Sequence, residues 1–457
     1  MRRFIGDKEF YKHVFILVIP IIIQQGISSV VNLLDNIMVG VLGQEAISSV
    51  SISNQLITIS MLAVFGGLSA ISIYSAQFYG SGNMEGMRYA FRSKIILGAI
   101  IAVVTIILLL NFGDIFTGLF LKGDANGGDI ALTLTYAKKY MQVILVGMVP
   151  FTLTQAYAGT LRETGQTFVP MVASVAAILT NLVFNWLLIY GHLGFPKWGV
   201  FGAAVATSLS RYLEFAILVI YTHTHTRRYI FMQGAFRSLY VPAALVKKMF
   251  ITGIPLFMNE FLWSFGMTAI SQSYSVKGFD VVSATTISST AWNMFMVFMV
   301  AMGSAIQIIV GQELGMGEIE KARDTDAKLI VLNLGLNLAV GIVLIVVSPY
   351  IPLLFNVNAS IREMARMMLI INGAVLPIES TVHSLYFTIR SGGKTFITFL
   401  FDSVYTWLVP LPLAFFLCRL TSMDIVLIYG IVQFSSVIKM LIGLFVLKKG
   451  TWAEKIV

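Results

Sequence analysis

The sequence predicts an all-α polytopic membrane protein with twelve transmembrane helices in two six-helix lobes. Of its 457 residues, 57% are hydrophobic and only 12% are charged, and the mean hydropathy is +0.84. A soluble protein of this composition could not cover its surface with polar groups, whereas lipid solvates apolar side chains. The single cysteine, Cys418, excludes an internal disulfide and a cysteine-rich metal site.

Twelve apolar segments are long enough to cross the hydrocarbon core of a bilayer. They lie near residues 13–39, 47–79, 92–112, 136–160, 168–190, 199–221, 249–273, 284–309, 327–347, 365–388, 396–417 and 425–447. The second is long for a single crossing and is expected to tilt. No small-residue cleavage site follows the basic stretch 1–12, so we interpret the first segment as an uncleaved span.

Positive charge is distributed unequally between the two sides of these spans. Of the 31 lysines and arginines, 21 fall in the segments on the side of the N-terminus and 8 fall on the opposite side. The positive-inside rule therefore predicts a multi-pass protein of the plasma (inner) membrane with both termini in the cytoplasm. The net charge of +9 then reflects topology, and nucleic acid is not an expected partner.

The two halves of the chain repeat each other. Equivalent residues lie 235 positions apart, namely Pro20 with Pro255, Gln25 with Glu260, Gln77 with Gln312 and Gly80 with Gly315. Residues 162–168 likewise match residues 390–396. We therefore expect an N-lobe over 1–225, a cytoplasmic linker over 226–248 and a C-lobe over 249–457. Two lobes of equal orientation, related by a pseudo-two-fold axis, are typical of transporters that work by alternating access.

Acidic side chains inside the spans are candidates for function. An acid at the centre of a membrane helix costs about 2.5–3.5 kcal/mol and usually has a role. Five lie in the predicted spans, namely Asp35, Glu214, Glu260, Glu379 and Asp402. Asp402 is interpreted either as a residue of a central cleft or as a capped structural acid.

Two of these acids have a basic residue close by in sequence, with which each could interact on the same helix. Arg211 precedes Glu214 by three residues, which favours an ion pair on one helix face. His383 follows Glu379 by four residues on one face of a helix. It could relay protons near neutral pH or make a structural hydrogen bond.

A set of oxygen-bearing side chains accompanies Asp35. Asn181 and Asn185 are four residues apart on the fifth span, and Thr207 lies on the sixth. Carboxylate, amide and hydroxyl oxygens suit Na⁺, or a protonatable acid with hydrogen-bonding neighbours, rather than zinc. The alternative is that the asparagines only join helices by hydrogen bonds, as is common in membrane bundles.

Other functions find little support. The sequence has no Walker loop, so active transport would use an ion gradient. It has no Gly-x-Ser-x-Gly or His-Glu-x-x-His motif, and its five histidines are scattered, which disfavours a membrane-embedded enzyme. A flippase for lipid-linked oligosaccharides would need several basic residues inside the spans, where only Arg211 and Lys439 occur. A channel would leave the duplication unexplained.

The chain resembles the multidrug and toxic compound extrusion (MATE) family over nearly its whole length. The resemblance rests on the order and spacing of five features: Asn32–Gly43 (NLLDNIMVGVLG), Gln155 with Leu161–Gly165, Gly202–Thr207, Glu260 and Glu379. It implies no enzyme activity and no cofactor beyond the coupling ion. It implies an antiporter that is driven by Na⁺ or H⁺ and exports amphipathic, often cationic organic compounds by alternating access as a monomer.

The resemblance also assigns site residues. In the N-lobe, Asp35, Asn181 and Thr207 match acid and ligand positions of the family, whereas Asn185 stands where the family has an Asp. Glu260 and Glu379 match the two acids of the C-lobe. We expect coupling through both lobes in part, with Na⁺ slightly ahead of H⁺. Accessory roles are expected for Gln25, Gln155, His383 and Asp402.

Overall fold

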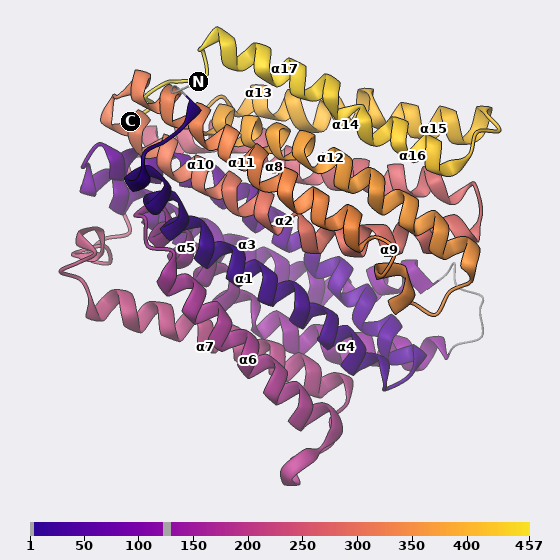
Figure 1. Cartoon of the computed structure of the whole chain (residues 1–457). Coiled ribbons are helices and arrows are strands. Elements are labelled where there is room, and N and C mark those ends of the chain that lie inside the picture. The colour runs from indigo at the N-terminus through magenta and orange to yellow at the C-terminus, as the bar shows by residue number, and fades with distance from the viewer. Residues whose placement is uncertain (1–3, 122–128) are drawn as a thin grey trace. The chain divides into compact units, whose positions relative to one another are not determined.

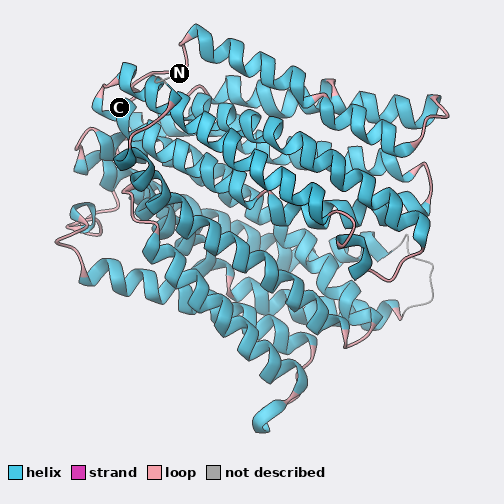
Figure 2. Ribbon diagram, in the orientation of Figure 1, coloured by secondary structure: helices cyan, strands magenta, loops and turns pink. Residues whose placement is uncertain are grey.

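The computed structural model describes residues 4–121 and 129–457, and these ranges contain helices and no strand (Figures 1 and 2). The longer helices are α1 (Lys8–Gly40), α2 (Gln44–Gly80), α3 (Met84–Leu121), α4 (Ile130–Val146), α5 (Met148–Glu163), α6 (Phe168–Tyr190), α7 (Val200–Thr224), α8 (Ala243–Ser275), α9 (Phe279–Phe295), α10 (Val297–Met316), α11 (Ile319–Val347), α12 (Ala359–Ser391), α15 (Pro410–Leu420), α16 (Ile425–Phe434) and α17 (Ser436–Lys449). The short elements are η2 (His192–Gly194), η3 (Ile230–Met232), η4 (Ile351–Leu354), α13 (Thr395–Phe399), the π-helix η5 (Leu400–Val404) and α14 (Tyr405–Leu408).

Each of the twelve apolar segments predicted from the sequence falls on helical residues, although segment 284–309 covers the end of α9 and most of α10. Within the described ranges, ten stretches are long and apolar enough to cross a membrane, and the pair α4 and α5 makes an eleventh. The predicted segment 249–273 falls in α8, a helix of 33 residues that carries Glu260, continues through Pro255 and is not one of these apolar stretches. The predicted all-α polytopic class is therefore confirmed.

The bend between α4 and α5 has a local cause. The two helices meet at 43°, and Gly147 lies between them. A Cβ atom at Gly147 would lie 3.2 Å from the Cα atom of Ser208 on α7. The Ser208 hydroxyl donates a hydrogen bond of 2.8 Å to the Val143 carbonyl oxygen at the end of α4. Glycine therefore permits α7 to pack directly against the break.

The described helices form two compact units. The C-terminal unit contains Lys248–Val457, the start of α1 up to Ile22 and the short stretch Ala76–Gly82; the N-terminal unit contains Ile23–Ser75 and Asn83–Lys247. Helices α1 and α2 thus each contribute to both units. The predicted lobe boundaries at 225 and 249 stay a prediction.

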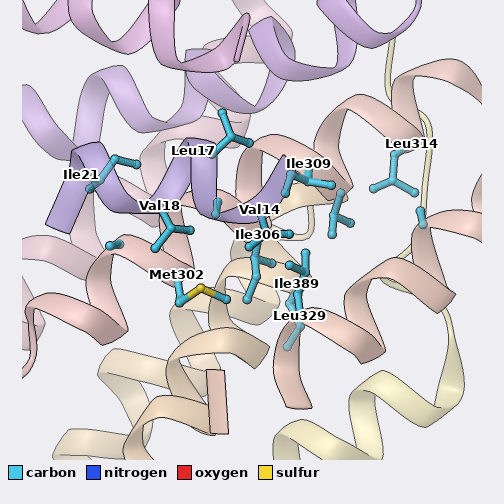
Figure 3. Close-up of a cluster of buried hydrophobic side chains, with 14 of the residues drawn as sticks. Val14, Leu17, Val18, Ile21, Met302, Ile306, Ile309, Leu314, Leu329 and Ile389 are labelled. Atoms are coloured by element: carbon cyan, nitrogen blue, oxygen red, sulfur yellow. The ribbon is translucent and has the colours of Figure 1, made fainter. Parts of the chain in front are cut away.

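The core of the C-terminal unit joins the start of α1 to α10. Figure 3 shows Val14, Leu17 and Val18 of α1 beside Met302 and Ile306 of α10. All five are at most 1% exposed. Burying these side chains in the core stabilises the fold mainly because they pack closely against one another.

The last residues of the chain are fixed to the same unit. The Trp452 side chain is 1% exposed and belongs to the core that Figure 3 shows in part. The Gln77 amide nitrogen donates to the carbonyl oxygens of Ser391 (3.0 Å) and Glu454 (3.1 Å), and its oxygen accepts from the Ile456 backbone N–H (2.9 Å). One glutamine thus joins the end of α2, the end of α12 and the C-terminal segment.

The internal duplication is visible in how the ends of α2 and α10 cross. A Cβ atom at Gly80 would lie 2.0 Å from the Gln312 carbonyl oxygen, and one at Gly315 would lie 2.1 Å from the Gln77 carbonyl oxygen. Gly80 and Gly315, like Gln77 and Gln312, are the pairs that the 235-residue offset makes equivalent. The two repeats therefore make the same close helix contact in reciprocal form.

Replacing Gly80 by Ala is expected to destabilise the protein, because the added methyl group would overlap a backbone oxygen. Overpacking of this kind costs about 1–3 kcal/mol, so the melting temperature in detergent, followed by tryptophan fluorescence, would fall. Gly335→Ala on α11 is the matched control, since no atom lies within 4 Å of its Cβ position. An equal melting temperature for Gly80→Ala and wild type would contradict the close crossing.

Candidate cation-coupling sites

The N-terminal unit positions its polar cluster through a close approach of α6 and α7. A Cβ atom at Gly202 would lie 2.6 Å from the Leu188 carbonyl oxygen. Ala203, Ala204 and Ala206 follow on α7 and are at most 5% exposed. Small residues allow two membrane helices to approach closely. The Thr207 hydroxyl consequently lies 3.2 Å from the Asn181 amide nitrogen on α6.

The four residues predicted for this cluster lie together. The Asn185 amide nitrogen donates to Asp35 Oδ1 over 2.8 Å and lies 3.2 Å from Asn181 Oδ1. Asn185 and Asn181 are 2% and 7% exposed, respectively, and Asp35 on α1 is half-buried. The i, i+4 spacing of the two asparagines therefore does place both amides on the face of α6 toward Asp35.

The cluster offers oxygen ligands that its own hydrogen bonds do not use fully. The buried Asn185 Oδ1 has no hydrogen-bond partner in the described part of the chain. If the Asn181 amide is rotated by half a turn, its nitrogen lies 2.9 Å from Asp35 Oδ2 and its oxygen lies 3.2 Å from Thr207 Oγ1. Among the described residues, no basic side chain forms an ion pair with Asp35. A carboxylate surrounded by amide and hydroxyl oxygens can hold a small hard cation or a proton.

The surroundings of Glu214 differ from the predicted local ion pair. The Arg211 guanidinium lies over the Phe151 ring, 5.1 Å from its centroid, and it forms no ion pair within 4.0 Å among the described residues. Glu214 hydrogen-bonds Ser174 and is attracted by Arg162 and, to a smaller extent, by Arg211. The i, i+3 spacing brings Arg211 near enough to attract Glu214, but the guanidinium lies against an aromatic face on α5 and does not contact the carboxylate directly.

Two predicted accessory residues of the N-terminal unit make few contacts. Gln25 is exposed on α1, and Gln155 is half-buried on α5. The neighbouring Gln24 instead accepts a hydrogen bond of 3.0 Å from Arg162 through its Oε1 atom. The register of α1, which sequence spacing did not fix, decides which glutamine faces α5.

In the C-terminal unit, Asp402 lies in the π-helix η5, Leu400–Val404. Asn259 of α8 donates to Asp402 Oδ2 over 2.9 Å, and the Ser403 hydroxyl donates to Asn259 Oδ1 over 2.7 Å. The extra residue of a π turn changes the helical phase, so the consecutive residues Asp402 and Ser403 can both reach α8. Such turns occur often at functional sites.

A lysine neutralises Asp402. Lys439 of α17 donates to Asp402 Oδ1 over 2.6 Å, and the two side chains are 11% and 15% exposed. The ammonium also lies 5.4 Å from the Phe401 ring centroid and 5.7 Å from that of Tyr405. Asp402 is therefore held in a buried ion pair, and its expected role as a residue of a central cleft stays a prediction.

Glu260 and Glu379 face different partners. Ser436 of α17 donates to Glu379 Oε1. Glu260 is attracted by the Arg390 guanidinium and repelled by the Asp402 carboxylate. Among the described residues, no hydrogen bond joins the two glutamates. Three carboxylates thus share this cluster with two basic side chains, Lys439 and Arg390.

His383 lies at the edge of the same cluster. Its ring is half-buried on α12, and its Nε2 atom is buried without a hydrogen-bond partner in the described ranges. It contacts Phe387, with 4.9 Å between ring centroids. Among the described residues, His383 forms no hydrogen bond or ion pair with Glu379, although the two residues are one turn apart.

Sequence reasoning missed several residues of these sites. Lys439 had a usable signal, because a basic side chain inside an apolar span requires an acidic partner. Asn259 and Ser436 gave no signal beyond their polarity. Glu163 and Asp326 lie just outside the predicted spans 136–160 and 327–347, and they are nevertheless only 4% and 1% exposed. Glu163 pairs with Lys94, and Asp326 accepts from the Thr388 hydroxyl.

Ten long apolar helical stretches in the described part of the chain, with an eleventh formed by α4 and α5, duplicated halves and acidic side chains within the apolar helices together indicate a multi-pass membrane transporter. The MatE family model matches residues 20–187 and 255–416. The two matches begin at Pro20 and Pro255, the first pair of equivalent residues in the internal repeat. The chain therefore belongs to the MatE family, whose members are transporters and not enzymes.

Relatives and solved structures agree with this assignment. The chain is 25% identical over 420 residues to the probable multidrug resistance protein NorM of Thermotoga maritima, covering 90% of this chain and 86% of the relative. It is 24% identical over 448 residues to the probable multidrug resistance protein YoeA of Bacillus subtilis (strain 168), covering 93% and 94%. A crystal structure of MATE in complex with MaL6 has a TM-score of 0.85 at 20% identity, covering 98% of this chain and 97% of that chain.

A second solved structure has the same fold. An outward-facing conformation of a multidrug resistance MATE family transporter has a TM-score of 0.84 at 20% identity, with 98% of each chain covered. The predicted family and the fold of twelve helices in two six-helix lobes are confirmed. The membrane-embedded enzyme is excluded as an alternative, because members of this family are transporters.

Proposed function

We propose that this protein is a cation-coupled antiporter that exports amphipathic, often cationic organic compounds by alternating access. We further propose that the Asp35 cluster is its principal coupling site, with Na⁺ as the first coupling ion. One observation carries the assignment: Asp35 lacks a basic partner among the described residues, and the oxygen of the neighbouring Asn185 is buried without a partner. The names of the relatives, which are multidrug resistance proteins, support the substrate class.

The coupling follows from the charge of Asp35. An ionised carboxylate away from water is unfavourable unless a cation or a proton neutralises it. Na⁺ and a cationic substrate therefore compete to neutralise the transporter's carboxylates. An ion that binds one conformation more strongly than the other shifts the equilibrium between the inward-open and outward-open states. Asn181, Asn185 and Thr207 would supply further oxygen ligands, with no cofactor besides the ion.

The C-terminal cluster suits a different role. Lys439 and Arg390 offset part of the charge of Glu260, Glu379 and Asp402, which leaves a net charge of −1 if all five are ionised. We propose that Glu260 and Glu379 contribute negative potential toward a cationic substrate and couple the ion only in part. We propose accessory roles for Gln25, Gln155, His383 and Asp402. The protein is proposed to act as a monomer in the inner membrane with both termini in the cytoplasm.

Ethidium efflux from proteoliposomes tests this function. An imposed Na⁺ gradient is expected to drive efflux, and an imposed pH gradient of equal size is expected to drive it more slowly. Efflux driven by the pH gradient alone would support an antiporter whose coupling ion is H⁺ and not Na⁺. The absence of efflux under both gradients would contradict cation coupling, and lipid-linked sugars would then be the next substrates to test.

A further inference from the structure

A basic cavity in the N-terminal unit is lined by residues other than those of the Asp35 cluster. Its volume is about 440 Å³, and it is lined by Glu85, Arg88, Arg92, Gln233, Gly234 and Arg237. The first three residues come from the start of α3, and the others follow η3 in the connection between α7 and α8. Three arginines and one glutamate give this lining a net charge of +2 if all four are ionised.

The wall of the cavity is held in place by Arg92, which is 8% exposed. Its guanidinium donates to three carbonyl oxygens of the connection, those of Ala235 (2.6 Å), Gly234 (3.0 Å) and Tyr240 (3.0 Å). Carbonyl oxygens satisfy hydrogen-bond donors but do not cancel the charge of a cation. Arg92 therefore shapes the cavity and still contributes its full positive charge.

Aromatic packing fixes the same wall. Phe91 is fully buried, and its ring contacts those of Phe231 and Phe236 at centroid distances of 5.7 and 5.9 Å. Met232 and Ala235 are at most 5% exposed. The connection is thus packed onto α3 as a built surface, which a ligand would find already formed.

The arginines of the cavity lack acidic partners. None of the three forms an ion pair among the described residues. Arg88 donates a long hydrogen bond of 3.4 Å to the Ile230 carbonyl oxygen, and its buried Nε atom has no partner in the described part of the chain. The Glu85 carboxylate accepts from the Tyr89 hydroxyl over 2.5 Å. Unpaired guanidinium groups of this kind bind phosphate oxygens through paired N–H donors.

Several residues close in sequence to the cavity-lining residues have exposed apolar side chains. Ile230, Phe236, Leu239 and Tyr240 are 49%, 47%, 58% and 65% exposed. Aromatic and aliphatic groups of this kind are typical of the membrane–water interface, where one end is apolar and the other is wet. A free phosphate ion would gain nothing from them, whereas a lipid carries acyl chains beside its phosphate.

We propose that this cavity binds the phosphate headgroup of an anionic phospholipid. Arg88 and Arg237 would contact the phosphate, Arg92 would hold the wall and add charge, and the exposed apolar residues would meet the lipid chains. Basic pockets near the cytoplasmic membrane surface bind anionic headgroups through this combination of charge and apolar contact. The charge count that predicts a cytoplasmic position for residues 226–248 agrees with this placement.

Native mass spectrometry of the purified full chain, titrated with phosphatidylglycerol or with phosphatidylcholine, tests the proposal. Wild type is expected to bind phosphatidylglycerol more tightly, and Arg88→Gln with Arg237→Gln is expected to weaken that binding about fivefold for each arginine removed. Arg92 is left intact so that the wall stays folded, which an unchanged melting temperature would verify. Arg227→Gln, an exposed arginine of the same connection outside the cavity, is the matched control and is expected to bind as wild type does.

Three results would overturn the proposal. The first is equal binding of the two lipids by wild type. The second is unchanged phosphatidylglycerol binding in the double variant or an equal loss in Arg227→Gln. The third is full displacement of the lipid by inorganic phosphate at millimolar concentration, which would mark the cavity as a site for free phosphate. None of these readouts depends on efflux, so a failure here leaves the proposed transport function untouched.

Discussion

Replacing Asp35 by Asn is expected to abolish Na⁺-driven efflux while the protein still folds and exchanges substrate. The amide keeps the shape of the side chain and its contact with Asn185, but it removes the only charge that attracts a cation to this cluster. An interaction with a charged group contributes about 1.5–3 kcal/mol, so gradient-driven ethidium efflux is expected to fall by about tenfold or more. Substrate counterflow without a gradient is expected to continue, because the variant can still change conformation.

Asp114→Asn is the matched control for this prediction. Asp114 belongs to the same unit, is exposed and pairs with Lys138 over 2.6 Å. The control is expected to transport as wild type does. Glu379→Gln adds a second comparison, since its efflux rate is expected to fall while the dependence on Na⁺ remains. A Na⁺ dependence that persists in Asp35→Asn and disappears in Glu379→Gln would place the coupling site in the C-terminal unit.

The fold class was predictable because it depends on properties that single residues carry. Apolar segments of spanning length, an excess of positive charge on one side and a repeat with fixed offsets need no knowledge of packing. The repeat even identified the glycines, Gly80 and Gly315, at which the two halves make reciprocal contacts. What the repeat did not reveal is that α1 and α2 each divide between the two compact units.

The Asp35 cluster was predictable for a more specific reason. The spacing of Asn181 and Asn185 fixes one face of one helix, and a regular helix keeps that phase. The approach of α1 and α7 to that face came from the resemblance to a family and not from the residues. Composition alone could not decide whether the asparagines serve a cation or only join helices.

The C-terminal cluster was less predictable because its helix is irregular. A π turn at Leu400–Val404 changes the phase of the helix at Asp402, so regular periodicity gives the wrong neighbours. Lys439 lies 37 residues after Asp402, and only tertiary packing brings them within 2.6 Å. These two facts could not be read from the sequence, which showed only that Glu260 and Glu379 are both present.

Removing either member of the Asp402–Lys439 pair is expected to destabilise the protein strongly. Lys439→Met keeps most of the apolar stem near Phe401 and Tyr405 but leaves Asp402 buried without its cation. Asp402→Asn leaves the ammonium buried without its anion. Breaking a buried ion pair costs about 3–5 kcal/mol, whereas replacing both members by neutral groups can be nearly neutral. The double variant is therefore expected to melt at a higher temperature than Lys439→Met alone.

The exposed pair of Asp114 and Lys138 supplies the matching cycle. Its nitrogen–oxygen distance is also 2.6 Å, but its side chains are 65% and 55% exposed, so Lys138→Met and Asp114→Asn are each expected to cost about 0–1 kcal/mol. The two ion pairs have the same nitrogen–oxygen distance but different burial. The difference between the losses of stability in the two sets of variants therefore measures the effect of desolvation. Lys439→Met could melt as wild type does, and within each pair the effects of the two single substitutions could add up to the effect of the double variant. In that case Asp402 is not held by a structural ion pair. Asp402 would then be free to bind a cation, and the proposed coupling site would be assigned to the cluster that contains Glu260 and Glu379.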